Sequence, residues 1–258
     1  KNFLKKIFGL FNFLVSIVES FIIIKKYKPC LIFGFGGYVS LPGTISGFVL
    51  NIPVVTHEQN SIAGTANKIN YFLSKRIFET FPMSFNRQSN KIIHTGNPVR
   101  DNFNELESPE SVYSDSKSQI NILILGGSQG SSFFNNTLPF AISNFDNNNI
   151  SVKHICGFDN KKIVQGKYLK YKINAEVLEF TNDIDKCFNW STLVVCRAGS
   201  TSISEVAKIG RASIIIPFPY ATDNHQLINA EYLAKNSATI LLEQKDDFIE
   251  NFITTINI

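Results

Sequence analysis

The stretch from Leu193 to Gln226 constrains the fold most, because it places two buried strands around one helix. The apolar runs Leu193–Cys196 and Ser213–Ile216 predict parallel strands that are covered on both faces. The helix between them ends near Gly210, a residue type that commonly terminates helices, and Pro217 ends the second strand. A strand–helix–strand unit of this kind predicts an α/β fold with a parallel sheet.

The start of this predicted helix is a candidate anion site. Its free N–H groups and positive dipole end point at the turn Arg197–Ser200, whose small side chains let a ligand approach the backbone. A phosphate or diphosphate suits such a turn. Ser202 and Glu205 have the spacing of a capping box, so Glu205 has two open interpretations. It caps the helix, or it accepts hydrogen bonds from the ribose of a ligand whose phosphates lie at the helix end.

Length and composition limit the class of protein. The 258 residues suffice for one large or two medium α/β domains, and 44% hydrophobic with 18% charged residues exclude a disordered chain. The net charge of +4 is a mild bias, so no nucleic-acid partner is expected. The four cysteines lack paired spacing and lie mostly in apolar runs, which indicates reduced thiols in a cytosolic protein and argues against zinc.

Residues 1–28 combine lysines with a long apolar stretch. Asn12, Ser16 and Glu19 interrupt that stretch, which argues against a membrane span, and no small-residue cleavage site follows it. An amphipathic helix with a wide apolar face remains. We expect most of it to pack on a sheet, while its basic, aromatic surface suits an anionic bilayer.

Two glycine loops follow predicted strands. The loop at Gly34–Tyr38 lacks the third glycine and the acid of a dinucleotide fingerprint, so a nicotinamide-binding domain is disfavoured. The loop at Gly126–Ser132 lies between a strand and a helix, and its N–H groups with Ser128 suit an anion better. It has no lysine and is not a Walker loop. Asp183 and Asp185 stand at a predicted helix start, where capping explains them, and no metal is predicted.

Polar residues follow several other predicted strands, where parallel sheets bind ligands. His57–Asn60 follows one strand, Arg100 follows the turn at Pro98, and Asp223–Gln226 follows another. Taken singly, these are also explained as a structural histidine, a surface arginine, and a helix capped by Thr222 or Asp223. The acidic, Ser-rich stretch 101–119 indicates a domain boundary. We therefore expect domains at 1–105 and 120–258, joined by a linker at 106–119.

These motifs together resemble glycosyltransferase family 28, the bacterial enzymes that transfer N-acetylglucosamine from UDP-N-acetylglucosamine to undecaprenyl-linked lipid I, giving lipid II for peptidoglycan. The resemblance implies a GT-B architecture, with two Rossmann-like domains of parallel sheets and a cleft between them. It implies a peripheral protein on the cytoplasmic face of the bacterial inner membrane, with no cofactor. The segments that carry it are Gly36–Ser40, His57–Asn60, Thr95–Arg100, Gly126–Gly130, Cys196–Glu205 and Asp223–Gln226.

Roles follow from the resemblance at matching positions. It implies that the acceptor side holds Gly36, Gly37, Tyr38, His57 and Glu58. It implies that Ser128 and Ser200–Thr201 hold the diphosphate, Glu205 the ribose and Thr181 the uracil. Residues implied to reach the N-acetylglucosamine or the donor's other side are Asn60, Arg100, His225 and Gln226.

The family begins with a strand and a glycine-rich loop that carries its proposed general base, and no such loop precedes Lys1. The family's C-terminal helices are also absent after Ile258. We therefore expect a fragment with an incomplete first domain, an unidentified catalytic base and little activity. The alternative is a non-catalytic UDP-sugar-binding module, or a donor-binding subunit that needs a partner.

Overall fold

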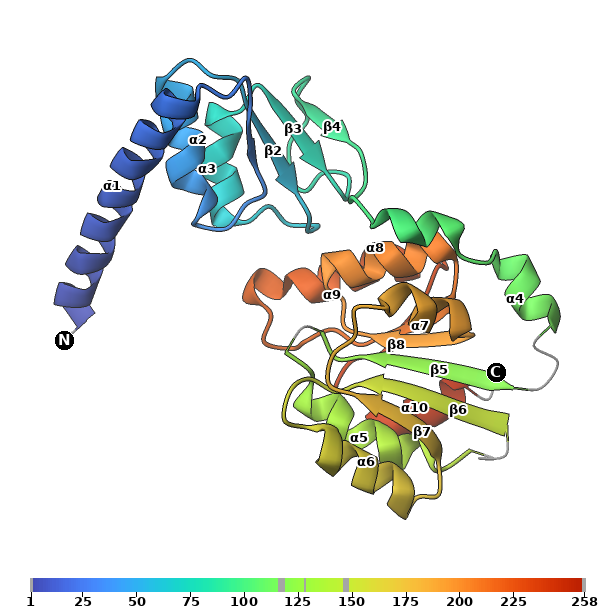
Figure 1. Cartoon of the computed structure of the whole chain (residues 1–258). Helices are drawn as coiled ribbons and strands as arrows, with labels where there is room; N and C mark the ends of the chain where they lie inside the picture. Colours follow the sequence, from blue (N-terminus) through green and yellow to red (C-terminus); the bar gives the residue numbers. More distant parts are fainter. Residues whose placement is uncertain (1, 116–118, 128, 146–148, 257–258) are drawn as a thin grey trace. The chain divides into compact units, whose positions relative to one another are not determined.

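The computed structural model describes residues 2–115, 119–127, 129–145 and 149–256. The chain divides into two compact units, Lys1–Asn97 and Pro98–Ile258 (Figure 1). Each unit contains one sheet whose neighbouring strands all pair in parallel, and helices connect the strands. The predicted α/β fold with parallel sheets is therefore confirmed.

The first unit has the strand order β1-β2-β3-β4, so each strand pairs with its neighbour in the sequence. The β1–β2 connection passes through a glycine turn in which Gly36 and Gly37 have φ of 79° and 69°. These are backbone angles that side chains other than glycine rarely adopt. The elements are β1 (Ile32–Gly34), α2 (Ser40–Val49), β2 (Val54–Glu58), α3 (Thr65–Leu73), β3 (Arg76–Glu79) and β4 (Ile92–His94).

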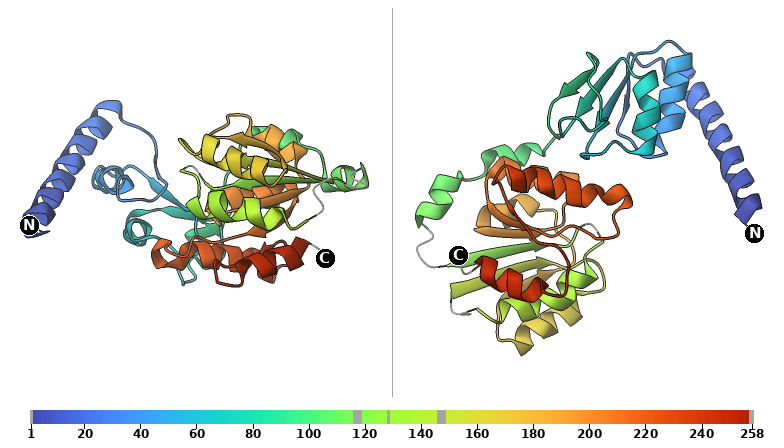
Figure 2. Two further views of the ribbon diagram at one scale, coloured as in Figure 1. Left: turned by 90° about the horizontal axis from the view of Figure 1, so that it is seen from below. Right: turned by 180° about the vertical axis from the view of Figure 1, so that it is seen from behind.

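Helix α1 (Asn2–Tyr27) packs against α2, and its other end projects away from the rest of this unit (Figures 1 and 2). Ser46 of α2 donates a hydrogen bond to the Ile17 carbonyl at 3.0 Å, and Ile24 is buried. The prediction that most of the helix packs on a sheet is wrong, because α2 is its neighbour and most of its apolar side chains are exposed. By length and composition alone, 7–27 would also suffice to cross a membrane.

The second unit has the strand order β10-β9-β8-β5-β6-β7. Helices α5, α6 and α10 cover one face of its sheet, and α7, α8 and α9 lie on the other (Figures 1 and 2). Its strands are β5 (Ile120–Leu125), β6 (Ile150–Ile155), β7 (Asn174–Leu178), β8 (Leu193–Cys196), β9 (Ala212–Ile215) and β10 (Ile240–Leu241). Its helices are α5 (Ser132–Ile142), α6 (Lys161–Lys170), α7 (Ile184–Trp190), α8 (Ser200–Ile209), α9 (His225–Lys235) and α10 (Phe248–Ile256).

The described residues of the stretch expected to join two domains, 106–115 and 119, belong to the second unit. A 3₁₀ helix, η1 (Asp101–Glu105), precedes this stretch, and the helix α4 (Pro109–Asp115) lies within it. Phe103 is buried against Phe188, with ring centroids 5.3 Å apart. Tyr113 donates its hydroxyl to the Thr192 carbonyl at 2.9 Å. These contacts place the division of the chain at Asn97–Pro98, ahead of the position that composition indicates.

Candidate functional site

The loops after β5, β7, β8, β9 and β10 surround a pocket of about 1080 Å³. They meet there because the carboxyl ends of parallel strands lie at one edge of the sheet. The expected residues that line it are Arg100, Thr181, Ser200, Thr201, Glu205 and Gln226. Ser128 lies outside the described residues, His225 is not part of the lining, and Asn60 belongs to the first unit.

The turn after β8 places the start of α8 at the pocket. Gly199 is the extended residue that precedes the helix, and Ser200 begins it. The capping box is wrong, because Ser202 lies inside the first turn and the N-cap residue is Gly199, which has no side chain to cap the helix. The first N–H groups of α8 are therefore left for solvent or a ligand.

Glu205 is the buried acid of this pocket. It is 4% exposed, and its Oε1 has no hydrogen-bond partner among the described residues. Arg100 is its ion-pair partner, with Nε 3.7 Å from Oε1. Burial raises the pKa of Glu205, and the nearby Arg100 charge opposes that rise. Glu205 lines the pocket, and its oxygen without a donor is an available acceptor for a hydroxyl group of a ligand.

The glycine loop after β5 is held closely against the loop after β6. Gly130 has φ of 75°, and a side chain on it would meet the backbone of Cys156 and Gly157. The side chain of Asn135 donates to the Cys156 carbonyl at 3.0 Å. Ser131 caps α5 by accepting the N–H of Phe134 at 3.3 Å. These contacts fix the described end of the loop, at Gly130 and Ser131, and place the start of α5 at the pocket.

Arg197 is a pocket residue that sequence reasoning did not single out. Its side chain lines the pocket, yet the residue is only 8% exposed. It donates to Ser131 Oγ at 2.7 Å and to the carbonyls of Ile216 and Pro217 at 3.2 and 3.1 Å. The available signal was a charged residue directly after a buried strand, where most neighbours are small or apolar.

The polar turn before α9 differs in detail from the expected capped helix. Asn224, in the left-handed region, precedes α9, so neither Thr222 nor Asp223 is its N-cap. His225 Nδ1 lies 2.6 Å from the Thr222 carbonyl oxygen, which turns the ring back on its own loop. Gln226 Oε1 accepts the N–H of Phe218 at 2.9 Å, and its amide nitrogen donates to none of the described residues.

The loop after β7 holds Thr181 at the pocket. Its hydroxyl accepts the N–H of Asp183 at 3.0 Å. Asp183 precedes α7 as expected, but its carboxylate pairs with Lys186 at 2.7 Å instead of capping the helix. Within the described part of the chain, no group of three or more His, Cys, Asp or Glu side chains has the geometry to hold a metal ion.

The residues expected on the acceptor side belong to the first unit. His57 and Glu58 are each 2% exposed and end β2, while Tyr38 is 79% exposed. His57 Nε2 lies 3.0 Å from the Gly96 carbonyl oxygen. Glu58 accepts the backbone N–H groups of Asn60 and Gly64 and the side chain of Asn67, at 2.9, 3.0 and 2.8 Å.

Asn67 is a second residue that sequence reasoning did not single out. It also donates to the His57 carbonyl at 3.1 Å, and a side chain at Gly36 would meet its amide at 2.8 Å. Asn67 therefore connects the first glycine turn to the end of β2. Its only signal was its place in a helix beside the His57–Asn60 segment.

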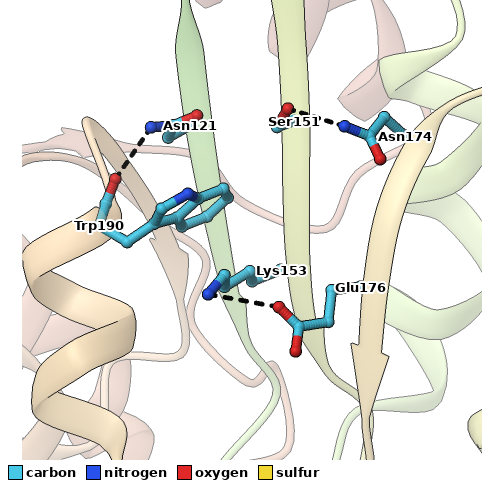
Figure 3. A network of polar contacts seen from close by, with 6 residues as sticks. All are labelled: Asn121, Ser151, Lys153, Asn174, Glu176 and Trp190. Carbon is cyan, nitrogen blue, oxygen red and sulfur yellow. Dashed lines mark hydrogen bonds and ion pairs between the residues drawn. The ribbon is translucent and has the colours of Figure 1, made fainter.

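A separate polar cluster lies on β5, β6 and β7 (Figure 3). Lys153 pairs with Glu176 at 3.3 Å and lies over the Trp190 ring, 4.8 Å from its centroid. Asn121 donates to the Trp190 carbonyl at 3.0 Å. Asn121 lies near the amino end of β5, and Lys153 and Glu176 lie near the middle of β6 and β7, whereas the pocket is formed at the carboxyl ends of the strands. The cluster joins neighbouring elements of the sheet and is not part of the pocket.

Comparisons with known proteins agree with this geometry. Residues 121–257 match the glycosyltransferase family 28 C-terminal domain, and residues 1–79 match the glycosyltransferase family 28 N-terminal domain. Curated relatives in Coxiella burnetii (strain Dugway 5J108-111) and Haemophilus ducreyi are 38% and 36% identical. The alignments cover 89% and 99% of this chain, and 64% and 71% of those proteins. Both are named UDP-N-acetylglucosamine–N-acetylmuramyl-(pentapeptide) pyrophosphoryl-undecaprenol N-acetylglucosamine transferase.

Solved structures match the fold. The crystal structure of Acinetobacter baumannii MurG has a TM-score of 0.80 at 30% identity, covering 96% of this chain and 69% of that one. UDP-GlcNAc 2-epimerase from Neisseria meningitidis, bound to UDP-GlcNAc, has a TM-score of 0.66 at 14% identity and shows the fold alone. It covers 95% of this chain and 71% of that one. The chain spans about two thirds of the length of these proteins, with the GT-B fold. It belongs to glycosyltransferase family 28.

Proposed function

We propose that this chain takes part in transferring N-acetylglucosamine from UDP-N-acetylglucosamine to undecaprenyl-linked lipid I, which gives lipid II for peptidoglycan synthesis. Membership of the family and the names of its relatives support this reaction. The observation that carries it is the buried Glu205 carboxylate, which has an oxygen without a donor beside the open start of α8.

The second unit binds the donor in this proposal. Glu205 accepts the ribose hydroxyls, and the first N–H groups of α8 at Ser200 and Thr201 receive the diphosphate, helped by the glycine loop that contains Ser128. Thr181 lies where the uracil would be read through the backbone. Gln226 donates its free amide to the sugar.

Arg100, Asn60 and His225 complete the proposed donor contacts. Arg100 lines the pocket in the second unit. Asn60, in the first unit, is a further donor contact that the family resemblance implies. His225 needs its ring to leave the Thr222 carbonyl before it contacts the sugar.

The reaction inverts the sugar carbon in this proposal. The acceptor hydroxyl attacks the anomeric carbon in line, the bond to the diphosphate breaks, and UDP leaves with added negative charge. Fixed N–H groups directed at that charge stabilise it more in the transition state than in the bound donor. The residue that removes the proton of the acceptor is not identified.

The first unit binds the acceptor in this proposal, through the turn at Gly36, Gly37 and Tyr38. Tyr38 is well exposed, so it is the side chain placed to contact the lipid-linked sugar. His57 and Glu58 are buried and bonded within the unit, so they act by holding that turn and the Asn60 loop in place.

Helix α1 supports a peripheral site on the cytoplasmic face of the bacterial inner membrane. Phe8, Leu10, Phe11 and Leu14 are between 53% and 66% exposed on it. Lysines stand near both of its ends, at 5 and at 25, 26 and 28. Exposed apolar side chains flanked by lysines suit a helix that lies in an anionic membrane surface.

Calorimetry with UDP-N-acetylglucosamine and with NADH tests the donor site on the 258-residue chain. We expect binding of the sugar nucleotide and none of NADH. A folded chain that does not bind UDP-N-acetylglucosamine would overturn the proposal. Transfer of labelled sugar to lipid I is then measured.

Binding without transfer would support the second candidate, a UDP-sugar-binding fragment or subunit that needs a partner for activity. One observation favours this candidate specifically. All described residues that line the pocket belong to the second unit, so this unit carries a donor pocket of its own.

A further inference from the structure

We propose that Arg197 is the counter-ion and positioning residue for the diphosphate of the bound nucleotide. The inference rests on the proposed function, because it concerns the same pocket. Arg197 carries a buried charge at that pocket, and a bound diphosphate would neutralise it.

The guanidinium of Arg197 donates to one hydroxyl and two backbone carbonyls, at Ser131, Ile216 and Pro217. The side-chain oxygen of Gln244, with the amide turned to satisfy both groups, accepts from Nη2 at 2.7 Å. All of these acceptors are neutral. In the part of the chain that the structure describes, no carboxylate forms an ion pair with Arg197.

The charge of Arg197 is buried. Arg197 is 8% exposed and lies over aromatic rings, with Cζ 4.4 Å from the Phe134 centroid and 5.6 Å from the Phe218 centroid. Removal from water lowers the pKa of Arg197 to about 10, which leaves it charged at neutral pH. A buried charge is normally paired with an opposite charge. Arg197 is one of the residues that line the pocket, so an anion bound there would supply the missing charge.

Arg197 connects two loops of the pocket. Its Nη2 donates to Ser131, which is the N-cap of α5 and ends the glycine loop. Its Nη1 donates to the carbonyls of Ile216 and Pro217, which precede the turn where the Phe218 N–H donates to Gln226. One planar guanidinium therefore connects the loop proposed for the diphosphate with the loop proposed for the sugar. An ammonium group cannot reproduce these divergent bonds, since Lys lacks the rigid fork.

The test measures binding of UDP, uridine and inorganic pyrophosphate to the full chain and to Arg197→Gln. Lys208→Gln is the matched control, because it removes a charge from the exposed end of α8. We expect Arg197→Gln to weaken the binding of UDP at least about tenfold, as for loss of a charged hydrogen-bonding partner. The affinity for uridine should change less than threefold. Arg197→Lys should recover part of the UDP affinity, and Lys208→Gln should bind as the parent chain does.

The outcomes separate this inference from the proposed function. A parent chain that binds no UDP overturns both. A parent chain that binds UDP, with Arg197→Gln equal to it or equally weakened for UDP and uridine, overturns only the role of Arg197. If Arg197→Gln does not fold, the test is thermal unfolding of the parent chain with and without pyrophosphate. Pyrophosphate should raise the melting temperature of the parent chain, and no rise would overturn the counter-ion role.

Discussion

Arg100 Nε lies 3.7 Å from Glu205 Oε1, and the two side chains differ sharply in exposure, at 57% and 6%. The arginine is hydrated at the rim of the pocket, while the carboxylate lies beneath it. Burial raises the pKa of Glu205, and the Arg100 charge offsets only part of that rise. The ionised form of Glu205 is therefore disfavoured in the folded state relative to the unfolded chain, as is common for residues retained for binding.

Replacing Glu205 with Gln should stabilise the chain and weaken its binding of the donor substrate. The neutral amide removes a charge that burial disfavours, so the free energy of unfolding at pH 7 should rise by up to about 1 kcal/mol. UDP-N-acetylglucosamine should bind about tenfold more weakly, because the ribose loses a charged acceptor. Denaturant unfolding and calorimetry measure the two effects. Glu250→Gln, on the exposed side of α10, should change neither. A less stable Glu205→Gln would contradict the prediction.

The same carboxylate predicts a pH dependence of stability. Its pKa in the folded state lies above the ordinary value of 4.5. The folded chain therefore retains the proton at pH values where the unfolded chain has lost it. The stability that Glu205 contributes is fully present below pH 4.5 and is lost as the pH rises through its raised pKa.

Arg100→Ala should move this loss to higher pH, because it removes the charge that lowers the pKa of Glu205. The measurement is the difference in unfolding free energy between each chain and its Glu205→Gln counterpart, from pH 4 to 8. The gain in unfolding free energy from Glu205→Gln should grow with pH, and at pH 7 it should be larger in the Arg100→Ala background. Equal gains in the two backgrounds would show that Arg100 does not act on Glu205.

Much of the fold could be predicted because it depends on local pattern. The strand at Leu193–Cys196 has the bounds expected from its apolar run. Gly210 ends α8 in the left-handed conformation, as its residue type indicates. Failures came where tertiary contacts decide. The helix α4 has no apolar periodicity, and it is held by Tyr113 against the strands that follow much later.

The position of the site could be predicted in outline, because the loops that follow parallel strands meet at the carboxyl edge of the sheet. Arg197 was not predicted as part of it. Its partner Ser131 stands 66 residues earlier in the chain, so only the folded sheet brings them together. The capping box failed because α8 begins at Ser200, which places Ser202 and Glu205 within the helix.

Gly130→Ala should destabilise the second unit. The residue has φ of 75° and lies against the Cys156 and Gly157 backbone, so a methyl group meets atoms that cannot move aside. The left-handed angle alone costs about 1–2 kcal/mol, and the contact adds to it. Gly166→Ala is the control: it lies in α6 with no atom within 4 Å of the added carbon. It should raise stability by about 0.5–1 kcal/mol. Chemical denaturation of both variants compares them.

Glu58→Gln should destabilise the first unit. The two carboxylate oxygens together accept the N–H groups of Asn60, Gly64 and Asn67. An amide accepts through one oxygen only, so at least one buried donor loses its partner, at a cost of roughly 1–3 kcal/mol. Thermal unfolding monitored by circular dichroism measures the loss. Glu19→Gln, on the exposed surface of α1, should melt as the parent chain does. Unchanged melting of Glu58→Gln would mean that this carboxylate does not hold the loop.

Helix α1 should bind vesicles that contain anionic phospholipid. Phe8 and Phe11 are 66% and 61% exposed, so Phe8→Ser with Phe11→Ser removes apolar area without opening the core. The double variant should bind at least about tenfold more weakly in co-sedimentation, while its melting temperature stays unchanged. Lys25→Gln with Lys26→Gln should instead reduce the salt dependence of binding, because each lysine contributes on the order of 1 kcal/mol through charge. If neutral and anionic vesicles bind the parent chain equally, or if the double phenylalanine variant binds as well as the parent, α1 is not a membrane contact. Its exposed apolar side chains would then need a protein partner to cover them.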